Sequence, residues 1–208
     1  MVSKRRLEER DFKRRGPRRD PKFRILLVCE GAVTEREYFK GVRHHFRNQR
    51  VHVEVPEHPG VPLTVVETAQ RLAEAALQDA KQQRDDNLKF DSVWAVFDMD
   101  AHPHLPEAQK LAATNGIEVA LSNPCFELWA LLHIEEQRAH IERHAVASRL
   151  RRYFPDYEKL LPFENLIANY ELAVERAKSL EAEAAHHGDP GRNPSTAVYK
   201  LTELIRTG

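Results

Sequence analysis

Between residues 23 and 134, apolar runs of strand length alternate with longer stretches that have the periodicity of amphipathic helices. The apolar runs, interpreted as strands, cover residues 23–29, 51–55, 91–97 and 117–121. The intervening helices are predicted over residues 35–48, 64–85, 106–115 and 124–134. This alternating order is typical of a parallel sheet that is covered by helices on both faces. The sequence therefore predicts an α/β fold with a four-stranded, mainly parallel sheet flanked by helices.

The two ends of the chain differ from this alternating region. Residues 1–24 contain eleven Lys or Arg against four Asp or Glu, although the whole chain has a net charge of zero. Residues 1–22 have too few apolar side chains to fold alone, and we predict a flexible basic arm that either only aids solubility or binds phosphate or an acidic partner. Residues 23–138 are assigned to the α/β domain, and residues 139–208 to a helical C-terminal extension without a convincing strand.

Composition narrows the class of protein. Hydrophobic residues make up 41% and charged residues 31% of the chain, an ordinary balance for a soluble globular protein. The longest apolar run, Ile25–Cys29, is far shorter than the ~20 residues of a membrane span, so no membrane association is expected. Cys29 and Cys125 form no CxxC pair, which argues against a disulfide framework or a structural zinc site. Without a signal-type apolar segment near the N-terminus, we predict a cytoplasmic protein; its oligomeric state, including a homo-oligomer, stays open.

Three acidic residues fall at the carboxyl ends of predicted strands. Glu30 follows the first strand, Asp98 follows the third, and Asp100 lies two residues further on. Ligands of open α/β sheets bind at this edge, so we expect the three carboxylates to converge. Clustered carboxylates repel one another unless they are protonated or neutralised, and hard oxygen ligands suit Mg²⁺ or Mn²⁺. Taken singly, each acid is explained by solvation or turn capping; together they predict a metal site.

Further candidates surround these acids. Glu127, on the helix after the fourth strand, is either a fourth catalytic carboxylate or a structural residue. Glu35 lies in the first turn of its helix, where the helix dipole favours an acid even without a functional role. His102 and His104 flank the Asp-x-Asp loop and are candidate ligands or proton shuttles. Cys125 is interpreted as a packing residue because nothing nearby marks its thiol as activated.

Basic residues recur on one face of the first predicted helix. Arg36, Lys40 and Arg43 follow one another at three- or four-residue spacing, and Arg47 continues the series. A solvated helix face is the default explanation of such spacing. Their closeness to Glu30 in the sequence makes contact with nucleic-acid phosphates the alternative.

Four sequence motifs resemble those of the RloB family. They are residues 25–31 (ILLVCEG) with Thr34-Glu35 and Tyr38-Phe39, residues 93–100 (VWAVFDMD), residues 122–133 (SNPCFELWALLH) and residues 193–196 (NPST). The resemblance spans roughly residues 23–206 and leaves the basic arm outside. It implies a TOPRIM fold, with the superfamily's Glu at Glu30 and its Asp-x-Asp at Asp98 and Asp100. It also implies a place in bacterial restriction-modification and phage-defence loci, commonly beside a gene for an ATPase.

Three functions are compatible with these patterns. The first is a Mg²⁺- or Mn²⁺-dependent nuclease that cuts DNA or RNA, with Glu30, Asp98 and Asp100 as metal ligands and Glu127 beside them. The second is a phosphatase of the haloacid dehalogenase type, which we discount because its Asp-x-Asp motif would follow the first strand. The third is a non-catalytic, nucleic-acid-binding or regulatory partner of an ATPase.

Overall fold

The computed structural model describes residues 23–54, 61–99 and 104–208. The predicted basic arm, Asp100 and His102 lie outside these ranges. In the described part of the chain, five strands form one sheet in the order β2-β1-β3-β4-β5. Their bounds are Ile25–Cys29 (β1), Val51–Glu54 (β2), Ser92–Asp98 (β3), Glu118–Asn123 (β4) and Ser195–Thr196 (β5). The first four strands are mutually parallel, so the predicted mainly parallel sheet is confirmed.

Strands β1 and β3 lie side by side at the centre of the sheet. Leu27 pairs with Trp94, and Cys29 pairs with Val96, so both strands end at the same edge. The pairing continues one residue beyond β1, because the backbone N–H of Glu30 donates to the Val96 carbonyl at 2.9 Å. The register therefore brings the residues that follow β1 next to the end of β3.

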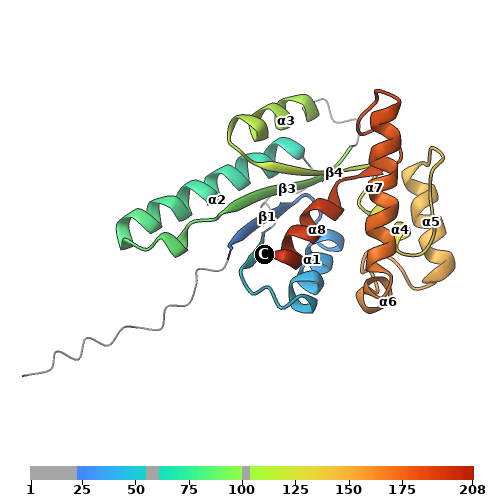
Figure 1. Ribbon diagram of the computed structural model, residues 1–208, viewed down its shortest axis with the longest axis horizontal. Helices are drawn as coiled ribbons and strands as arrows, with labels where there is room; N and C mark the ends of the chain where they lie inside the picture. Colours follow the sequence, from blue (N-terminus) through green and yellow to red (C-terminus); the bar gives the residue numbers. More distant parts are fainter. Residues whose placement is uncertain (1–22, 55–60, 100–103) are drawn as a thin grey trace, which may run out of the picture.

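Helices cover both faces of the sheet (Figure 1). Helices α2 (Pro62–Gln83) and α3 (Leu105–Thr114) pack on one face, and a short 3₁₀ turn, η1 (Asp86–Leu88), follows α2. The other face carries the remaining helices: α1 (Thr34–His45), α4 (Glu127–Leu132), α5 (Arg143–Tyr153), α6 (Phe163–Ile167), α7 (Tyr170–His186) and α8 (Val198–Thr207).

Strand β1 shows why the apolar runs are continuous. Ile25, Leu27 and Cys29 point into the core beneath α1 and α4, whereas Leu26 and Val28 point into the core beneath α2 and α3. All five residues are buried. A strand that is buried on both faces needs apolar side chains at every position, which is the pattern of a parallel sheet between two helical layers.

The prediction of four strands was wrong by one strand. Strand β5 pairs antiparallel with β4, with Ser122 opposite Thr196 and Asn123 opposite Ser195. The hydroxyl oxygens of Ser122 and Thr196 are 2.9 Å apart, and the backbone N–H of Ala197 donates to the Leu121 carbonyl. A two-residue strand is too short to leave a period-two pattern in the sequence, so it is specified by these tertiary contacts.

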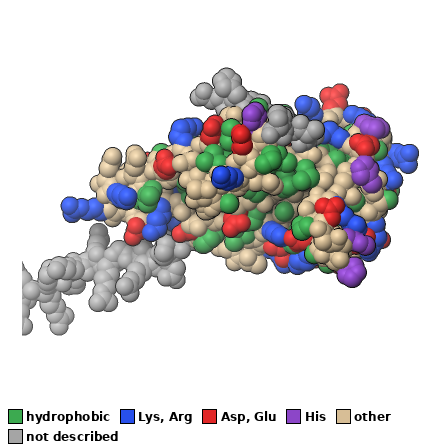
Figure 2. Space-filling model, turned by 90° about the horizontal axis from the view of Figure 1, so that it is seen from above, with side chains coloured by type: hydrophobic (Ala, Val, Ile, Leu, Met, Phe, Trp, Pro, Cys, Tyr) green, Lys and Arg blue, Asp and Glu red, His purple; other side chains and the backbone are tan. Residues whose placement is uncertain are grey.

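The residues after position 138 are mainly helical and share the core of the sheet. Leu201 and Ile205 of α8 belong to the same buried cluster as Ile25 and Phe39. Residues 163–186 are divided into two helices, α6 and α7, which residues 168 and 169 separate. Charged side chains of both signs and several histidines gather at the end of the molecule where α5 and α7 lie (Figure 2). Among the described residues, no helix has the length and apolar character that crossing a membrane requires.

Candidate functional site

The structure brings Glu30 and Asp98 together at the carboxyl edge of the sheet. The backbone N–H of Asp98 donates to Glu30 Oε2 at 3.1 Å. This contact follows from the adjacency of β1 and β3, since the two acids are 68 positions apart in the sequence. The third predicted acid, Asp100, lies outside the described residues.

Asp98 is the most constrained acid of the site. Its carboxylate accepts the backbone N–H of Phe126 at Oδ1 (2.8 Å) and the Arg143 guanidinium at Oδ2 (2.8 Å). Burial raises the pKa of Asp98 to about 8; Arg143 opposes this shift, and the charges of the neighbouring glutamates add to it. With a pKa of about 8 even beside Arg143, the Asp98 carboxyl is largely protonated at neutral pH unless a further positive charge binds next to it.

Glu35 is buried in the first turn of α1. Burial raises the pKa of Glu35 to about 7; backbone hydrogen bonds at Glu35 and Gly31 oppose the shift, and the charges of Glu127 and Glu30 add to it. The preceding loop makes room for this carboxylate at Gly31. A Cβ at position 31 would lie 1.8 Å from Glu35 Oε2, so a side chain there is incompatible with the observed position of Glu35.

Glu127 begins helix α4 and faces the same space. Its Oε1 accepts the phenol of Tyr157 at 3.1 Å. The neighbouring Cys125 is buried, and burial together with the charge of Glu127 raises the pKa of its thiol. Cys125 is therefore held as a thiol, in agreement with its interpretation as a packing residue.

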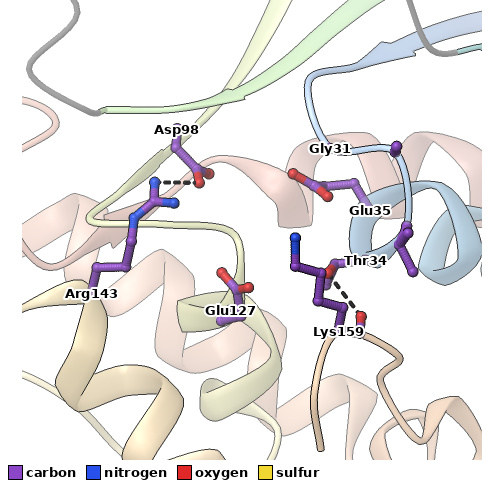
Figure 3. Close-up of a pocket in the computed structure, with 9 residues that line it drawn as sticks. Gly31, Thr34, Glu35, Asp98, Glu127, Arg143 and Lys159 are labelled. Atoms are coloured by element: carbon purple, nitrogen blue, oxygen red, sulfur yellow. Dashed lines mark hydrogen bonds and ion pairs between the residues drawn. The ribbon is translucent and has the colours of Figure 1, made fainter. Parts of the chain in front are cut away.

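These acids line a cavity of about 220 Å³ together with two cations (Figure 3). Its walls are residues 31–35, Asp98, Glu127, Arg143 and Lys159. The Lys159 side chain points into the space between Glu35 and Glu127 (Figure 3). The Thr34 hydroxyl donates to the Lys159 carbonyl at 2.8 Å and so fixes the backbone of this segment against the start of α1.

The cavity gathers several carboxylate groups. Its acidic oxygens come from Glu35, Asp98 and Glu127, with Glu30 behind the Asp98 backbone. Carboxylate oxygens are the ligands that Mg²⁺ and Mn²⁺ prefer. Within the described residues, which leave out Asp100, no three His, Cys, Asp or Glu side chains are placed so that they could hold a metal ion. The positive charge at Asp98 comes from Arg143, whose guanidinium lies 2.8 Å from Asp98 Oδ2.

The basic face of α1 is not gathered at this cavity. Arg36 is exposed on the first turn, and Lys40 pairs with Glu37 at 2.8 Å. Arg43 donates to the Val51 carbonyl at the start of β2, which is the opposite edge of the sheet. His104 is likewise engaged elsewhere, with Glu107 on α3 at 3.0 Å.

Sequence reasoning missed the two cations of the cavity. Arg143 is 45 positions from Asp98, and Lys159 is 125 positions from Thr34. Neither residue belongs to a recognisable motif, and Lys159 lies in an irregular segment between α5 and α6. The available signal was the composition of α5, which contains four Arg and no Asp or Glu.

Fold and site together define a protein with a mainly parallel α/β sheet and an acidic pocket at its carboxyl edge. The family model described as RloB-like protein matches residues 25–205. The chain therefore belongs to the RloB-like family. No curated protein and no solved structure matched the chain.

Proposed function

We propose that the chain is a Mg²⁺- or Mn²⁺-dependent nuclease that hydrolyses phosphodiesters of DNA or RNA. The observation that carries this proposal is the convergence of Glu30, Glu35, Asp98 and Glu127 at one edge of the sheet. Four acids at one place are stable only with protons or a cation. Burial, with the charges of the neighbouring acids adding to it, raises the pKa values of Glu35 and Asp98, so both acids favour a proton or a nearby cation.

The roles of the acids follow from their positions. Glu30 and Asp98 would hold the divalent cation, with Asp100 as the third ligand by family resemblance. A cation bound there supplies Lewis-acid chemistry, polarising the scissile phosphate and favouring deprotonation of the attacking water. Glu127, oriented by the Tyr157 phenol, is placed to accept a proton or to add a ligand.

The two cations of the cavity suit a phosphate substrate. Arg143 and Lys159 extend into the cavity from α5 and from the segment between α5 and α6, whereas the acids come from other elements. Guanidinium and ammonium groups bind non-bridging phosphate oxygens and stabilise the charge that develops on them during hydrolysis. Acids for a metal and cations for a phosphate therefore line the same cavity, where Arg143 pairs with Asp98.

The RloB-like family supplies the biological context of the proposal. By resemblance, the domain is of TOPRIM type and acts in bacterial anti-phage defence beside an ATPase that is encoded nearby. A nuclease that needs this ATPase for activation would be silent when assayed alone, so its test includes the partner.

The test is a cleavage assay with plasmid DNA, single-stranded DNA and transfer RNA in Mg²⁺, Mn²⁺ or EDTA, with and without the ATPase. We expect metal-dependent cleavage that Asp98→Asn and Glu30→Gln abolish. Glu118→Gln is the matched control, because Glu118 is an exposed acid at the opposite end of β4. Cleavage that survives Asp98→Asn would refute the proposed site. No cleavage under any condition would leave the regulatory function as the explanation.

A further inference from the structure

A second hollow, of about 380 Å³, lies at the end of α5 and in the segment that follows it. This volume falls within the ~300–1,000 Å³ range of small-ligand pockets. Its lining is largely aromatic or aliphatic: Tyr153, Phe154, Pro155, Tyr157, Leu160 and Leu161 contribute to it. The acidic cavity, by contrast, is lined mainly by charged residues, so the two spaces suit different parts of a ligand.

The hollow and the acidic cavity are separated by one short segment. Tyr157 lines the hollow, and its phenol donates to Glu127 of the acidic cavity at 3.1 Å. Lys159 lines the acidic cavity, and the next residue, Leu160, lines the hollow. A ligand that occupies both spaces therefore needs to cross only the segment of residues 157–160.

Two side chains with apolar surface border the hollow and are exposed. Leu160 is 64% exposed and Tyr153 is 48% exposed. The Tyr153 ring is held in place, because its phenol donates to Glu135 Oε2 at 2.7 Å and Arg149 binds the other oxygen of Glu135 at 3.0 Å. Apolar groups that line a pocket are suited to contact a ligand, and a fixed aromatic ring is a suitable stacking platform.

Arginines of α5 lie on either side of the hollow, whose own lining contains one acid, Asp156. Arg143, at the start of α5, lines the acidic cavity, whereas Arg151 and Arg152 are exposed in its last turn. Arg151 Nε also donates to the Tyr157 carbonyl at 3.3 Å, which joins α5 to the segment that separates the two spaces. These charges stand about 12 Å apart along the helix axis. A polyanion that follows α5 would meet cations at both ends of the helix.

We propose that the hollow binds the base of a nucleotide next to the scissile phosphate of a single-stranded nucleic acid. The inference rests on the proposed function of the acidic cavity. Base–aromatic stacking and a cationic groove are the two elements of single-strand binding. Single strands fit because the bases of a duplex are paired and stacked, and are not available to enter a side pocket.

The test measures the affinity of labelled single-stranded DNA and RNA oligonucleotides by fluorescence anisotropy in EDTA, which prevents metal-dependent cleavage. We expect Tyr153→Ala to weaken binding at least about fivefold, the lower end of stacking contributions, and Leu160→Ala to weaken it through the loss of apolar contact with the base. Tyr153→Phe keeps the ring but loses the hydrogen bond to Glu135, so its affinity should fall between those of the wild type and Tyr153→Ala. Leu77→Ala is the control for exposed leucine, since Leu77 is 43% exposed on α2. Thermal melting checks that every variant is folded.

A matched ligand tests the base itself. An oligonucleotide with an abasic site keeps its phosphates, so it should bind at least about fivefold more weakly than the intact strand if a base enters the hollow. Equal affinity of the two strands, or unchanged binding by Tyr153→Ala, would overturn the inference. Failure of every oligonucleotide to bind would overturn it as well and would leave the hollow to a protein partner.

The outcomes separate this inference from the nuclease proposal. Base-dependent binding without any metal-dependent cleavage would refute the nuclease and keep the base site. Metal-dependent cleavage with base-independent binding would refute the base site and keep the nuclease.

Discussion

The two helical layers of the molecule pack on the same sheet but have different roles. Helices α2 and α3 supply apolar side chains to the smaller core, and among the described residues they contribute nothing to the lining of the acidic cavity. The opposite layer supplies Glu35 from α1, Glu127 from α4 and Arg143 from α5. One layer thus stabilises the sheet, whereas the other also builds the site. Substitutions that are matched across the two layers can break this distinction.

The largest effect is expected from a pair of neighbours on β1. Leu26 and Leu27 are fully buried and face opposite layers. Leu26→Ala and Leu27→Ala should each lower the free energy of unfolding by about 2–5 kcal/mol, as measured by urea denaturation. At a temperature where both variants are folded, only Leu27→Ala should also reduce cleavage. The truncated side chain leaves a void beneath α1 and α4, the helices that carry Glu35 and Glu127. Equal loss of cleavage in both variants would contradict the assignment of the site to the layer of α1, α4 and α5.

His133, which is buried in the helical layer that builds the site, makes the stability of the protein depend on pH. His133 contacts the Trp129 carbonyl through Nδ1 (2.8 Å) and the Tyr38 phenol through Nε2 (3.4 Å), and Trp129 Nε1 donates to the same phenol at 2.7 Å. Burial lowers the pKa of His133 to about 4; the Trp129 carbonyl opposes the shift, and Arg176 adds to it.

This shift predicts a loss of stability in acid. The folded-state pKa lies below the ordinary value, so the contribution of neutral His133 is complete above about pH 6.5 and falls as the pH drops towards 4. The loss should reach about 3 kcal/mol. Urea unfolding at several pH values would measure it, and His133→Gln should flatten the dependence. An unchanged dependence in that variant would assign the acid sensitivity to other groups.

Two glycines, Gly116 after α3 and Gly31 before α1, should separate effects on cleavage from effects on stability. Gly116 ends the turn between α3 and β4 with φ +65° and open space around it, so Gly116→Ala should cost about 1–2 kcal/mol of stability without affecting cleavage. Gly31→Ala should displace the Glu35 carboxylate and lower cleavage about tenfold, with little change in melting temperature. Unaltered cleavage by Gly31→Ala would show that the position of the Glu35 carboxylate does not affect the reaction.

The smallest effect concerns two lysines. Lys159 lines the cavity, whereas Lys40 pairs with Glu37 on the face of α1. Lys159→Ala should reduce the salt dependence of single-strand binding by about 0.7 in the slope of log K against log salt, the value for one phosphate contact. Lys40→Ala should leave the slope unchanged. A reduced slope in Lys40→Ala would restore α1 as a nucleic-acid surface.

The sequence predicted the parts of the molecule that have a local signature. Residues 23–29 and 91–97 were predicted as strands, close to the observed Ile25–Cys29 and Ser92–Asp98, because burial on both faces requires continuous apolar side chains. The meeting of Glu30 and Asp98 could be expected for the same reason, since parallel strands end at one edge.

The parts that the sequence did not predict depend on contacts between distant segments. Strand β5 is held by β4, and Arg143 reaches Asp98 only because α5 packs beside α4. Arg43 shows the converse: helical spacing placed it on a face with Arg36, yet its partner is the Val51 carbonyl at the far edge of the sheet. Periodicity identifies residues that share a face, but the neighbour of that face is set by tertiary packing.

The most direct test of the account is a calorimetric titration of the metal-free protein with Mn²⁺ near neutral pH. The wild type should bind Mn²⁺ saturably, Glu118→Gln should bind it equally well, and Asp98→Asn should bind it at least about tenfold more weakly. Binding that is absent from the wild type, or that is as tight in Asp98→Asn as in the wild type, would contradict a cation site at this edge of the sheet.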